Sequence, residues 1–222
     1  MFKKQNLTTW IFVVVILVFV GVGVMGALSN KKDDSGVKPI PESTSKTFDI
    51  NEQPLIGKKD APVEMVLFAD YQCPHCKEWE DTVYPKVKAK YLDTGIASLR
   101  IVNFPVINIQ SYYAAMASEI VYSKNPSKWE SFHHLLYKNQ AVLTNDFLAE
   151  KMSEYTDYSK EEALSLLTKQ TKIDDVLSDE KEGDKRGVTG TPSFFIGGKK
   201  MDSYEAADIQ KAVDAAKKAA SK

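Results

Sequence analysis

The chain has 222 residues, a formal net charge of −1, 43% hydrophobic residues and 27% charged residues. This length and composition suit one globular domain of ordinary size with appendages. The balanced charge, with Arg100 and Arg186 as the only arginines, argues against nucleic acid as a partner, because its binders usually carry a basic surface rich in arginine.

The first predicted element is an uncharged, apolar run over residues 10–28. As a helix rising about 1.5 Å per residue it would be roughly 28 Å long, close to the thickness of a bilayer's hydrocarbon core. Lys3 and Lys4 precede the run, which favours a cytoplasmic tail over residues 1–9 and an external body. We expect a single-pass anchor in the cell membrane. A signal peptide cleaved at Ala27-Leu28-Ser29, giving a secreted form, is the open alternative.

Residues 29–50 are rich in Ser, Lys, Asp, Pro and Thr and contain little apolar surface to bury. This composition predicts a flexible linker, which would span roughly 25 Å on average. It would hold the body, residues 51–222, clear of the lipid headgroups.

The body opens with a short apolar run over residues 63–68, typical of a buried strand. A helical pattern follows from the cysteines to about Leu92, with an expected kink at Pro85 and a stop at Gly95. Residues 98–104 predict a second strand, so this part of the chain forms a β-α-β unit.

Helical periodicity continues through about residues 108–172, and a further helix is expected over residues 174–186. Gly197-Gly198 then separates two short strand patterns, which is a hairpin signal, and residues 204–220 close the chain as an amphipathic helix. The order predicts an α/β fold in which a block of helices separates a β-α-β unit from a β-β-α unit.

The chain's two cysteines, Cys73 and Cys76, stand at the predicted strand–helix junction. A sulfur at the start of a helix faces unpaired N–H groups, which stabilise a thiolate, and a second thiol three residues on can resolve a mixed disulfide. Pro74 suits the first helical turn, and His75 would add a donor or a positive charge beside the Cys73 sulfur. A stabilised thiolate favours the reduced form and makes the disulfide a stronger oxidant.

Other uses of the two cysteines fit the sequence less well. A zinc site needs two more ligands and the chain has three histidines, while covalent haem attachment needs a histidine where Lys77 stands. A structural disulfide closing so short a loop would constrain the unfolded chain very little. We therefore expect no metal and no organic cofactor, the redox centre being the Cys73–Cys76 disulfide in an exported domain, where disulfides persist.

Two stretches of sequence resemble a known family. Residues 57–63 with 68–76 (GKKDAPV and FADYQCPHC) and residues 187–195 (GVTGTPSFF) look like the DsbA-like thiol–disulfide oxidoreductases, in particular the membrane-anchored Gram-positive branch typified by BdbD. The resemblance covers about residues 54–215. It implies a thioredoxin fold with an all-helical domain inserted before the cis-proline strand.

The resemblance also implies roles for the site residues. Cys73 would attack and Cys76 would resolve, while Pro192 would be cis beside the sulfurs and the Thr191 backbone would pair with the substrate chain. The family suggests an oxidase that introduces disulfides into reduced exported proteins and is reoxidised by a quinone-linked membrane partner of the DsbB type. A reductase or isomerase of the same fold, and a non-catalytic chaperone or binding module, are the alternatives.

A proton acceptor for the Cys76 thiol would be a carboxylate near the end of the first strand. Strand alternation leaves Glu64 and Asp70 as candidates, although most acidic side chains lie on the surface without such a role. His133-His134, within the helical block, is expected to be structural.

Overall fold

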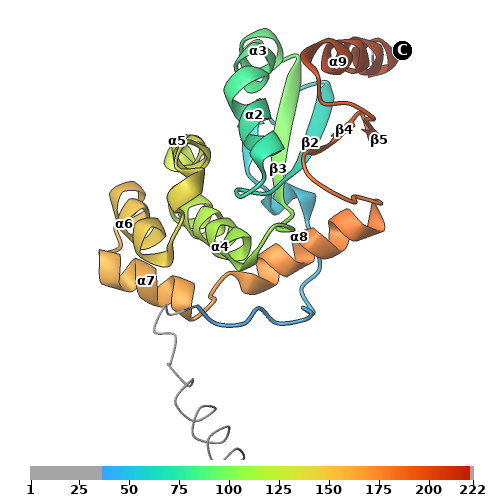
Figure 1. Cartoon of the computed structure of the whole chain (residues 1–222). Coiled ribbons are helices and arrows are strands. Elements are labelled where there is room, and N and C mark those ends of the chain that lie inside the picture. Colours follow the sequence, from blue (N-terminus) through green and yellow to red (C-terminus); the bar gives the residue numbers. More distant parts are fainter. Residues whose placement is uncertain (1–36, 221–222) are drawn as a thin grey trace, which may run out of the picture. The chain divides into compact units, whose positions relative to one another are not determined.

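A five-stranded mixed sheet lies at the centre of residues 37–220, the part of the chain that the computed structural model describes (Figure 1). Its strand order is β1-β3-β2-β4-β5, and the strands are β1 Leu55–Gly57, β2 Val63–Ala69, β3 Ala97–Asn103, β4 Ser193–Ile196 and β5 Lys199–Lys200. β2 and β3 are parallel, and the other neighbouring pairs are antiparallel. The predicted β-α-β and β-β-α units therefore meet where β2 pairs with β4.

Three expected elements lie partly or wholly outside the described residues: the tail over 1–9, the apolar segment over 10–28 and the start of the linker. Within residues 37–220, the helices all fall short of the length and apolar character needed to cross a membrane.

The helix after the cysteines is divided, as Pro85 predicts. α2 runs over Pro74–Thr82, α3 over Tyr84–Val87, and a π-helical turn, η2, over Lys88–Leu92. Proline has no N–H to donate to the preceding turn, so a continuous helix is interrupted just before it. Gly95 follows with a φ of 72°, a conformation that glycine adopts without steric cost, and it turns the chain into β3.

Five helices fill the space in the sequence between β3 and β4. They are α4 Ile109–Lys124, α5 Pro126–Lys138, α6 Asn145–Tyr155, α7 Lys160–Thr168 and α8 Ile173–Lys185. Asn108 and Ser111 form a capping box at the start of α4, and Asn125-Pro126 separates α4 from α5. Figure 1 shows α4 to α7 gathered on one side of the sheet, which confirms a helical block between the two sheet-forming units.

The second half of the sheet ends in the expected hairpin. Gly197 and Gly198 have φ values of 55° and 77°, which a tight two-residue turn between antiparallel strands requires. α9, Ala206–Ala220, follows and packs through Ile209 and Val213 against β2 and β4.

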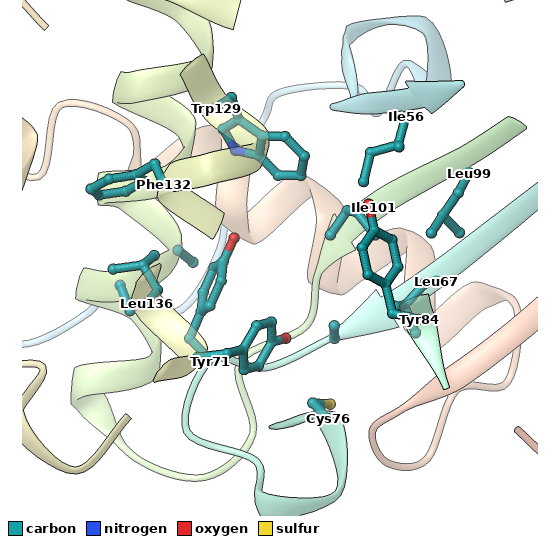
Figure 2. Packing of buried hydrophobic residues seen from close by; sticks show 14 of the residues in the cluster. Ile56, Leu67, Tyr71, Cys76, Tyr84, Leu99, Ile101, Trp129, Phe132 and Leu136 are labelled. Carbon is teal, nitrogen blue, oxygen red and sulfur yellow. The ribbon is translucent and has the colours of Figure 1, made fainter. Parts of the chain in front are cut away.

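The sheet is covered on both faces, because alternate side chains of β2 enter different clusters. Met65 and Leu67 join a large cluster that also contains Cys76 and residues of α2, α4, α5 and α9, part of which is drawn in Figure 2. Phe68 enters a smaller cluster on the other face, where α8 approaches so closely that a Cβ on Gly183 would lie 2.5 Å from a ring carbon of Phe104. Both cysteines are therefore set into the larger core.

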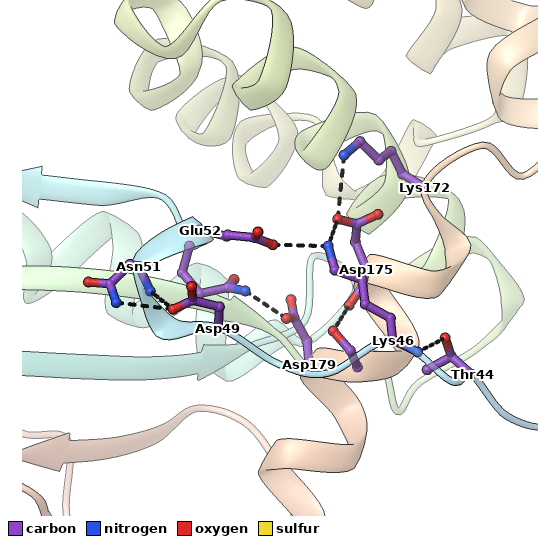
Figure 3. Close-up of polar contacts among 10 residues, drawn as sticks. Thr44, Lys46, Asp49, Asn51, Glu52, Lys172, Asp175 and Asp179 are labelled. Carbon is purple, nitrogen blue, oxygen red and sulfur yellow. Dashed lines mark hydrogen bonds and ion pairs between the residues drawn. The ribbon is translucent and has the colours of Figure 1, made fainter.

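The linker prediction is wrong for its described part, residues 37–50. Val37 and Ile40 pack against the core, and the Lys38 N–H donates to the Tyr113 hydroxyl at 2.6 Å. Figure 3 shows Lys46, whose ammonium group lies 2.5 Å from Asp175 and 3.0 Å from Glu52. Composition could not predict this, because the segment is attached by backbone groups and a few single side chains rather than by an apolar pattern.

Candidate active site

Cys73 is the N-cap residue of α2, with Pro74 at the first helical position. Its own N–H donates to the Asp70 carbonyl at 3.0 Å, which forms the tight turn that connects β2 to the helix. The backbone N–H groups of the first helical turn have no partner within the helix, so they are available to the Cys73 sulfur. Both cysteines are free thiols in the structure.

The pKa of the Cys73 thiol is lowered from 9.0 to about 5. The largest cause is a hydrogen bond from the Cys76 thiol, and it outweighs the burial that acts in the opposite direction. The Thr191 hydroxyl and the backbone N–H groups of Cys76 and His75 lower the pKa further. Cys73 is consequently a thiolate at neutral pH.

Cys76 has the opposite character. It is 2% exposed and more enclosed than Cys73, and burial is the main reason that its pKa is raised above the ordinary value. Its hydrogen bond to Cys73 adds to this effect, since the two sulfurs share one proton that Cys76 keeps. The pair is therefore a nucleophile beside a protonated thiol.

The distant segment that the resemblance identified lies against these sulfurs. The Thr191–Pro192 peptide bond is cis, and the Cys73 sulfur lies 3.2 Å from the Thr191 carbonyl oxygen, to which it donates only when Cys73 is protonated. The Thr191 hydroxyl is buried and has no partner at hydrogen-bonding geometry within the described residues, yet it lowers the pKa of both cysteines. Thr191 and Pro192 thus lie where the resemblance implies the substrate-binding segment to be.

The His75 ring, expected beside the Cys73 sulfur, has a carboxylate as its neighbour on α2. Its side chain is 66% exposed, and Nδ1 lies 3.5 Å from Glu78 on the next turn of α2. The backbone N–H of His75, rather than its imidazole, contributes to the lowered pKa of Cys73.

Both predicted proton acceptors have hydrogen-bonding partners other than Cys76. Glu64 is at the other end of β2 from the cysteines, where its half-exposed carboxylate pairs with Arg100 at 3.1 Å. Asp70 is buried near Cys76, but its carboxylate accepts three backbone N–H groups, from Gln72 at 2.7 Å, Val106 at 2.8 Å and Ile107 at 3.0 Å. Asp70 therefore joins the turn before α2 to the loop after β3, and its role as a base for Cys76 stays a prediction, whereas Glu64 lies at the far end of β2.

Gln140 is a site residue that the sequence motifs do not indicate. Its side-chain amide donates to the carbonyl oxygens of Tyr71 and Cys73, each at 2.9 Å. The Gln72 amide donates back to the Gln140 carbonyl at 3.1 Å. The turn between α5 and α6, η3 Gln140–Val142, is thereby fixed to the turn that carries the nucleophile.

A buried cluster of ionisable side chains supports α2 one turn beyond Cys76. Burial alone would raise the pKa of Glu80, but His133 and His134 of α5 lower it to about 2. His134 hydrogen-bonds Glu80, and Glu130 and Glu80 raise its pKa to about 9 against the opposing effect of burial. The spacing of Cys76 and Glu80, four residues on one helix face, was the signal that could have drawn attention to Glu80.

Tyr71 connects this cluster to the active-site turn. Its hydroxyl lies 2.8 Å from His133 Nδ1 and 2.8 Å from Ser118 Oγ, and burial raises its pKa above the ordinary value. The two rings join α5 to α2 through Glu80, and His133 also contacts Tyr71, as the structural role expected of His133-His134 requires.

Comparisons with known proteins agree with this geometry. The thioredoxin family model matches residues 49–215. The chain is 28% identical over 212 residues to a probable disulfide bond formation protein D of Bacillus anthracis, covering 92% of each chain. Among solved structures, BdbD from Bacillus subtilis in its oxidised form matches with a TM-score of 0.73 and 28% identity, over 80% of this chain and all of that one. Chlamydia trachomatis DsbA, at 20% identity and a TM-score of 0.70, shares the fold.

Proposed function

The chain belongs to the thioredoxin family, as a DsbA-like thiol–disulfide oxidoreductase, and we propose that within this family it is an oxidase that introduces disulfide bonds into exported proteins. The observation that carries the proposal is the low pKa of Cys73, about 5, which the hydrogen bond from the Cys76 thiol and the backbone N–H groups at the start of α2 produce. A thiolate stabilised to this degree weakens the disulfide relative to the dithiol, so the protein gives its disulfide away.

The reaction begins from the Cys73–Cys76 disulfide. A substrate thiolate attacks the Cys73 sulfur, a bond forms between the two, and Cys76 leaves as a thiolate that takes up a proton. A second substrate thiolate then attacks the substrate sulfur of this mixed disulfide and expels the Cys73 thiolate. The substrate loses two electrons, and the protein becomes the dithiol.

The unequal pKa values of the two cysteines suit this direction. Cys73 is a good leaving group, because its thiolate is stabilised by Cys76, Thr191 and the helix start. Cys76 is a weak nucleophile at neutral pH, because burial keeps it protonated. The mixed disulfide therefore reverts slowly through Cys76, and the second substrate thiol has time to react.

The proposal extends to the place and partners of the reaction. The uncharged run over residues 10–28, after Lys3 and Lys4, supports a membrane anchor with the catalytic body outside the cytoplasm. Reduced exported proteins would be the substrates. A quinone-linked membrane protein of the DsbB type would remove the two electrons that Cys73 and Cys76 collect. The redox-active disulfide needs no further cofactor.

The test uses the full chain, purified with Cys73 and Cys76 as a disulfide, and a reduced, unfolded model protein whose native state has disulfides. We expect oxidation of the model protein at a rate that disappears in both Cys73→Ser and Cys76→Ser, because neither variant can form the disulfide that accepts the two electrons. An oxidised chain that leaves the model protein reduced rules out the oxidase. A chain found mostly reduced in cells by thiol trapping would instead indicate a reductase or isomerase. A cellular function that survives Cys73→Ser unchanged would indicate a chaperone.

A further inference from the structure

Gln140, at the start of η3, bridges two carbonyl oxygens of the active-site turn. Its half-buried side-chain amide donates to the Tyr71 carbonyl and to the Cys73 carbonyl, each at 2.9 Å. A primary amide has two N–H donors, so the two bonds use its full donor capacity. The Gln72 amide donates in return to the Gln140 carbonyl oxygen at 3.1 Å. Three hydrogen bonds therefore join Gln140 to three consecutive residues of the turn.

The bridged carbonyl groups belong to a buried part of the chain. Tyr71 and Cys73 are 2% and 4% exposed, so their carbonyl oxygens need partners within the protein. The Cys73 carbonyl also accepts the Lys77 N–H at 3.1 Å, which begins the hydrogen bonding of α2. Loss of the Gln140 amide would take a donor from each oxygen, and a buried carbonyl without a partner is costly. The backbone of residues 71–73 would then have to rotate to reach other donors.

The side chain of Tyr71 is attached to the helical block as well. Its hydroxyl lies 2.8 Å from Ser118 Oγ on α4 and 2.8 Å from His133 Nδ1 on α5. Trp129, also on α5, donates to the same Ser118 oxygen at 2.8 Å, and Figure 2 shows Trp129 and Tyr71 in the core. These bonds hold the ring independently of Gln140. A change at Gln140 therefore acts on the backbone of Tyr71 and on the residues that follow it.

The ionisation of Cys73 is sensitive to the position of this backbone. The Cys76 thiol is the largest cause of its low pKa, and against the effect of burial Thr191 and the backbone N–H groups of Cys76 and His75 add to it. Hydrogen bonds weaken steeply when distance and angle depart from their best values. These donors belong to α2 and to the segment before β4, so a rotation of the turn before α2 would move the sulfur relative to them.

We propose that Gln140 is a positioning residue of the redox centre, which holds residues 71–73 so that the Cys73 sulfur stays beside Cys76 and the start of α2. Gln140 acts on the sulfur through the two carbonyl oxygens and the backbone between them. The inference rests on the proposed function, and it adds a residue of the turn between α5 and α6 to the groups on which disulfide exchange depends.

The test replaces Gln140 by Met, which keeps the length of the side chain and removes both donors without adding a charge. The protein is the full chain in detergent, in its dithiol form. The pH dependence of alkylation by iodoacetamide gives the Cys73 pKa, because the thiolate is the reacting form. We expect this pKa to rise by about one unit, a tenfold weaker stabilisation of the thiolate. Gln140→Asn, whose shorter amide cannot span both oxygens, should shift it in the same direction.

Gln170 provides a matched control, because its half-buried amide also bridges two carbonyl oxygens. It donates to Lys38 at 3.2 Å and to Pro39 at 3.0 Å, in the N-terminal segment of the described residues. Gln170→Met loses the same two kinds of bond, so it should lower the midpoint of thermal unfolding as Gln140→Met does. Its Cys73 pKa should stay near 5. A purely structural role for Gln140 would make the two variants alike in both measurements.

A second readout separates the chemical step from peptide binding. The disulfide form of each variant is mixed with an excess of a reduced peptide that contains two cysteines, and a single turnover is followed. In Gln140→Met we expect the maximal rate to fall severalfold, because Cys73 becomes a poorer leaving group. The peptide concentration that gives half of this rate should not change. Gln170→Met should match the native chain in both values.

The results separate the role of Gln140 from the function on which it rests. A folded Gln140→Met whose Cys73 pKa stays near 5, or an equal rise in Gln170→Met, overturns the positioning role and leaves the oxidase standing. A native chain that leaves the peptide reduced overturns the proposed function, while the comparison of the two pKa values still decides whether Gln140 positions Cys73.

Discussion

The Cys73 sulfur lies 3.2 Å from the Thr191 carbonyl oxygen, although 118 residues separate the two along the chain. The contact joins the start of α2 to the segment that precedes β4, and the whole helical block lies between them in the sequence. The redox properties of the nucleophile therefore depend on a residue outside its own motif.

Replacement of Thr191 tests this dependence. Thr191→Val removes the hydroxyl that lowers the pKa of Cys73 and keeps the shape of the side chain. A hydrogen bond to a charged group contributes about 1.5–3 kcal/mol, so we expect the pKa to rise by roughly one unit from about 5. The pH dependence of thiolate absorbance measures it. Thr191→Ser keeps the hydroxyl and serves as the control, and an unchanged pKa in Thr191→Val would show that the hydroxyl has no part.

The stability of the reduced protein should depend on the ionisation of Cys73. Its pKa is depressed from 9.0 to about 5, so the stabilisation is complete above pH 9 and is lost as the pH falls through about 5. At pH 7, about two pH units above the lowered pKa, ionisation of Cys73 stabilises the folded protein by about 3 kcal/mol. Urea unfolding of the reduced and disulfide forms should show their difference shrinking from pH 7 to pH 4.5. A difference that does not change over this range contradicts the low pKa.

Ionisation of Glu119 makes the stability of the protein depend on pH with the opposite sign. It is buried on α4, where the Asn103 side-chain amide donates to it at 2.7 Å, and burial followed by the charge of Asp175 raises its pKa to about 7. Its stabilising contribution is complete below pH 4.5 and is lost as the pH rises through about 7. Glu119→Gln keeps the oxygen that accepts from Asn103 and carries no charge.

We therefore expect Glu119→Gln to be more stable than the native chain at pH 8, by on the order of 2 kcal/mol, and equally stable near pH 4. Urea unfolding at the two pH values measures this. Glu161→Gln, an exposed position on α7, is the matched control and should change neither value. A loss of stability at pH 8 in Glu119→Gln would mean that the carboxylate is needed in its charged form.

The cluster beyond Cys76 can be tested through His134. Glu80 is one of the two carboxylates that raise the pKa of His134 to about 9. In Glu80→Gln, with one of these carboxylates gone, we expect this pKa to fall by about one unit or more, followed by NMR of the imidazole. Glu78→Gln, on the exposed side of α2, should leave it near 9. An unchanged value in Glu80→Gln would remove Glu80 from the cluster.

Because α8 packs closely on the sheet, we expect one added methyl group on α8 to lower the stability of the protein. A Cβ on Gly183 would lie 2.5 Å from Phe104 and 3.2 Å from Phe68, so Gly183→Ala should destabilise the protein by about 1–3 kcal/mol. Gly190→Ala, where nothing lies within 4 Å, should change stability much less. Thermal unfolding compares the two, and equal effects would contradict the packing.

The order of elements and the redox centre could be predicted because their signals are local. A short apolar run indicated β2, the Pro85 break and the Gly197-Gly198 turn depend on single residues, and a helix start is recognisable from Cys73-Pro74. The roles of Thr191 and Pro192 came from the family resemblance, and the cis bond agrees with it.

What the sequence could not provide depends on tertiary contacts. Asp70 looked like a base, but the two N–H groups that occupy one of its oxygens come from a loop 36 residues away. Gln140 lies 67 residues from Cys73, and nothing in its local sequence indicates that it binds the active-site turn. Residues 37–50 read as linker because their attachments, such as that of Lys46 to Asp175, involve partners more than a hundred residues distant.

The reduction potential of the Cys73–Cys76 couple, measured against glutathione buffers at pH 7, tests the central claim most directly. Lowering the Cys73 pKa from 9.0 to about 5 stabilises the dithiol at pH 7 by about 60 mV. The account predicts a potential more positive than about −200 mV, in the range of proteins that donate disulfides. A potential near −270 mV, that of thioredoxin, would contradict an oxidase and indicate a reductase.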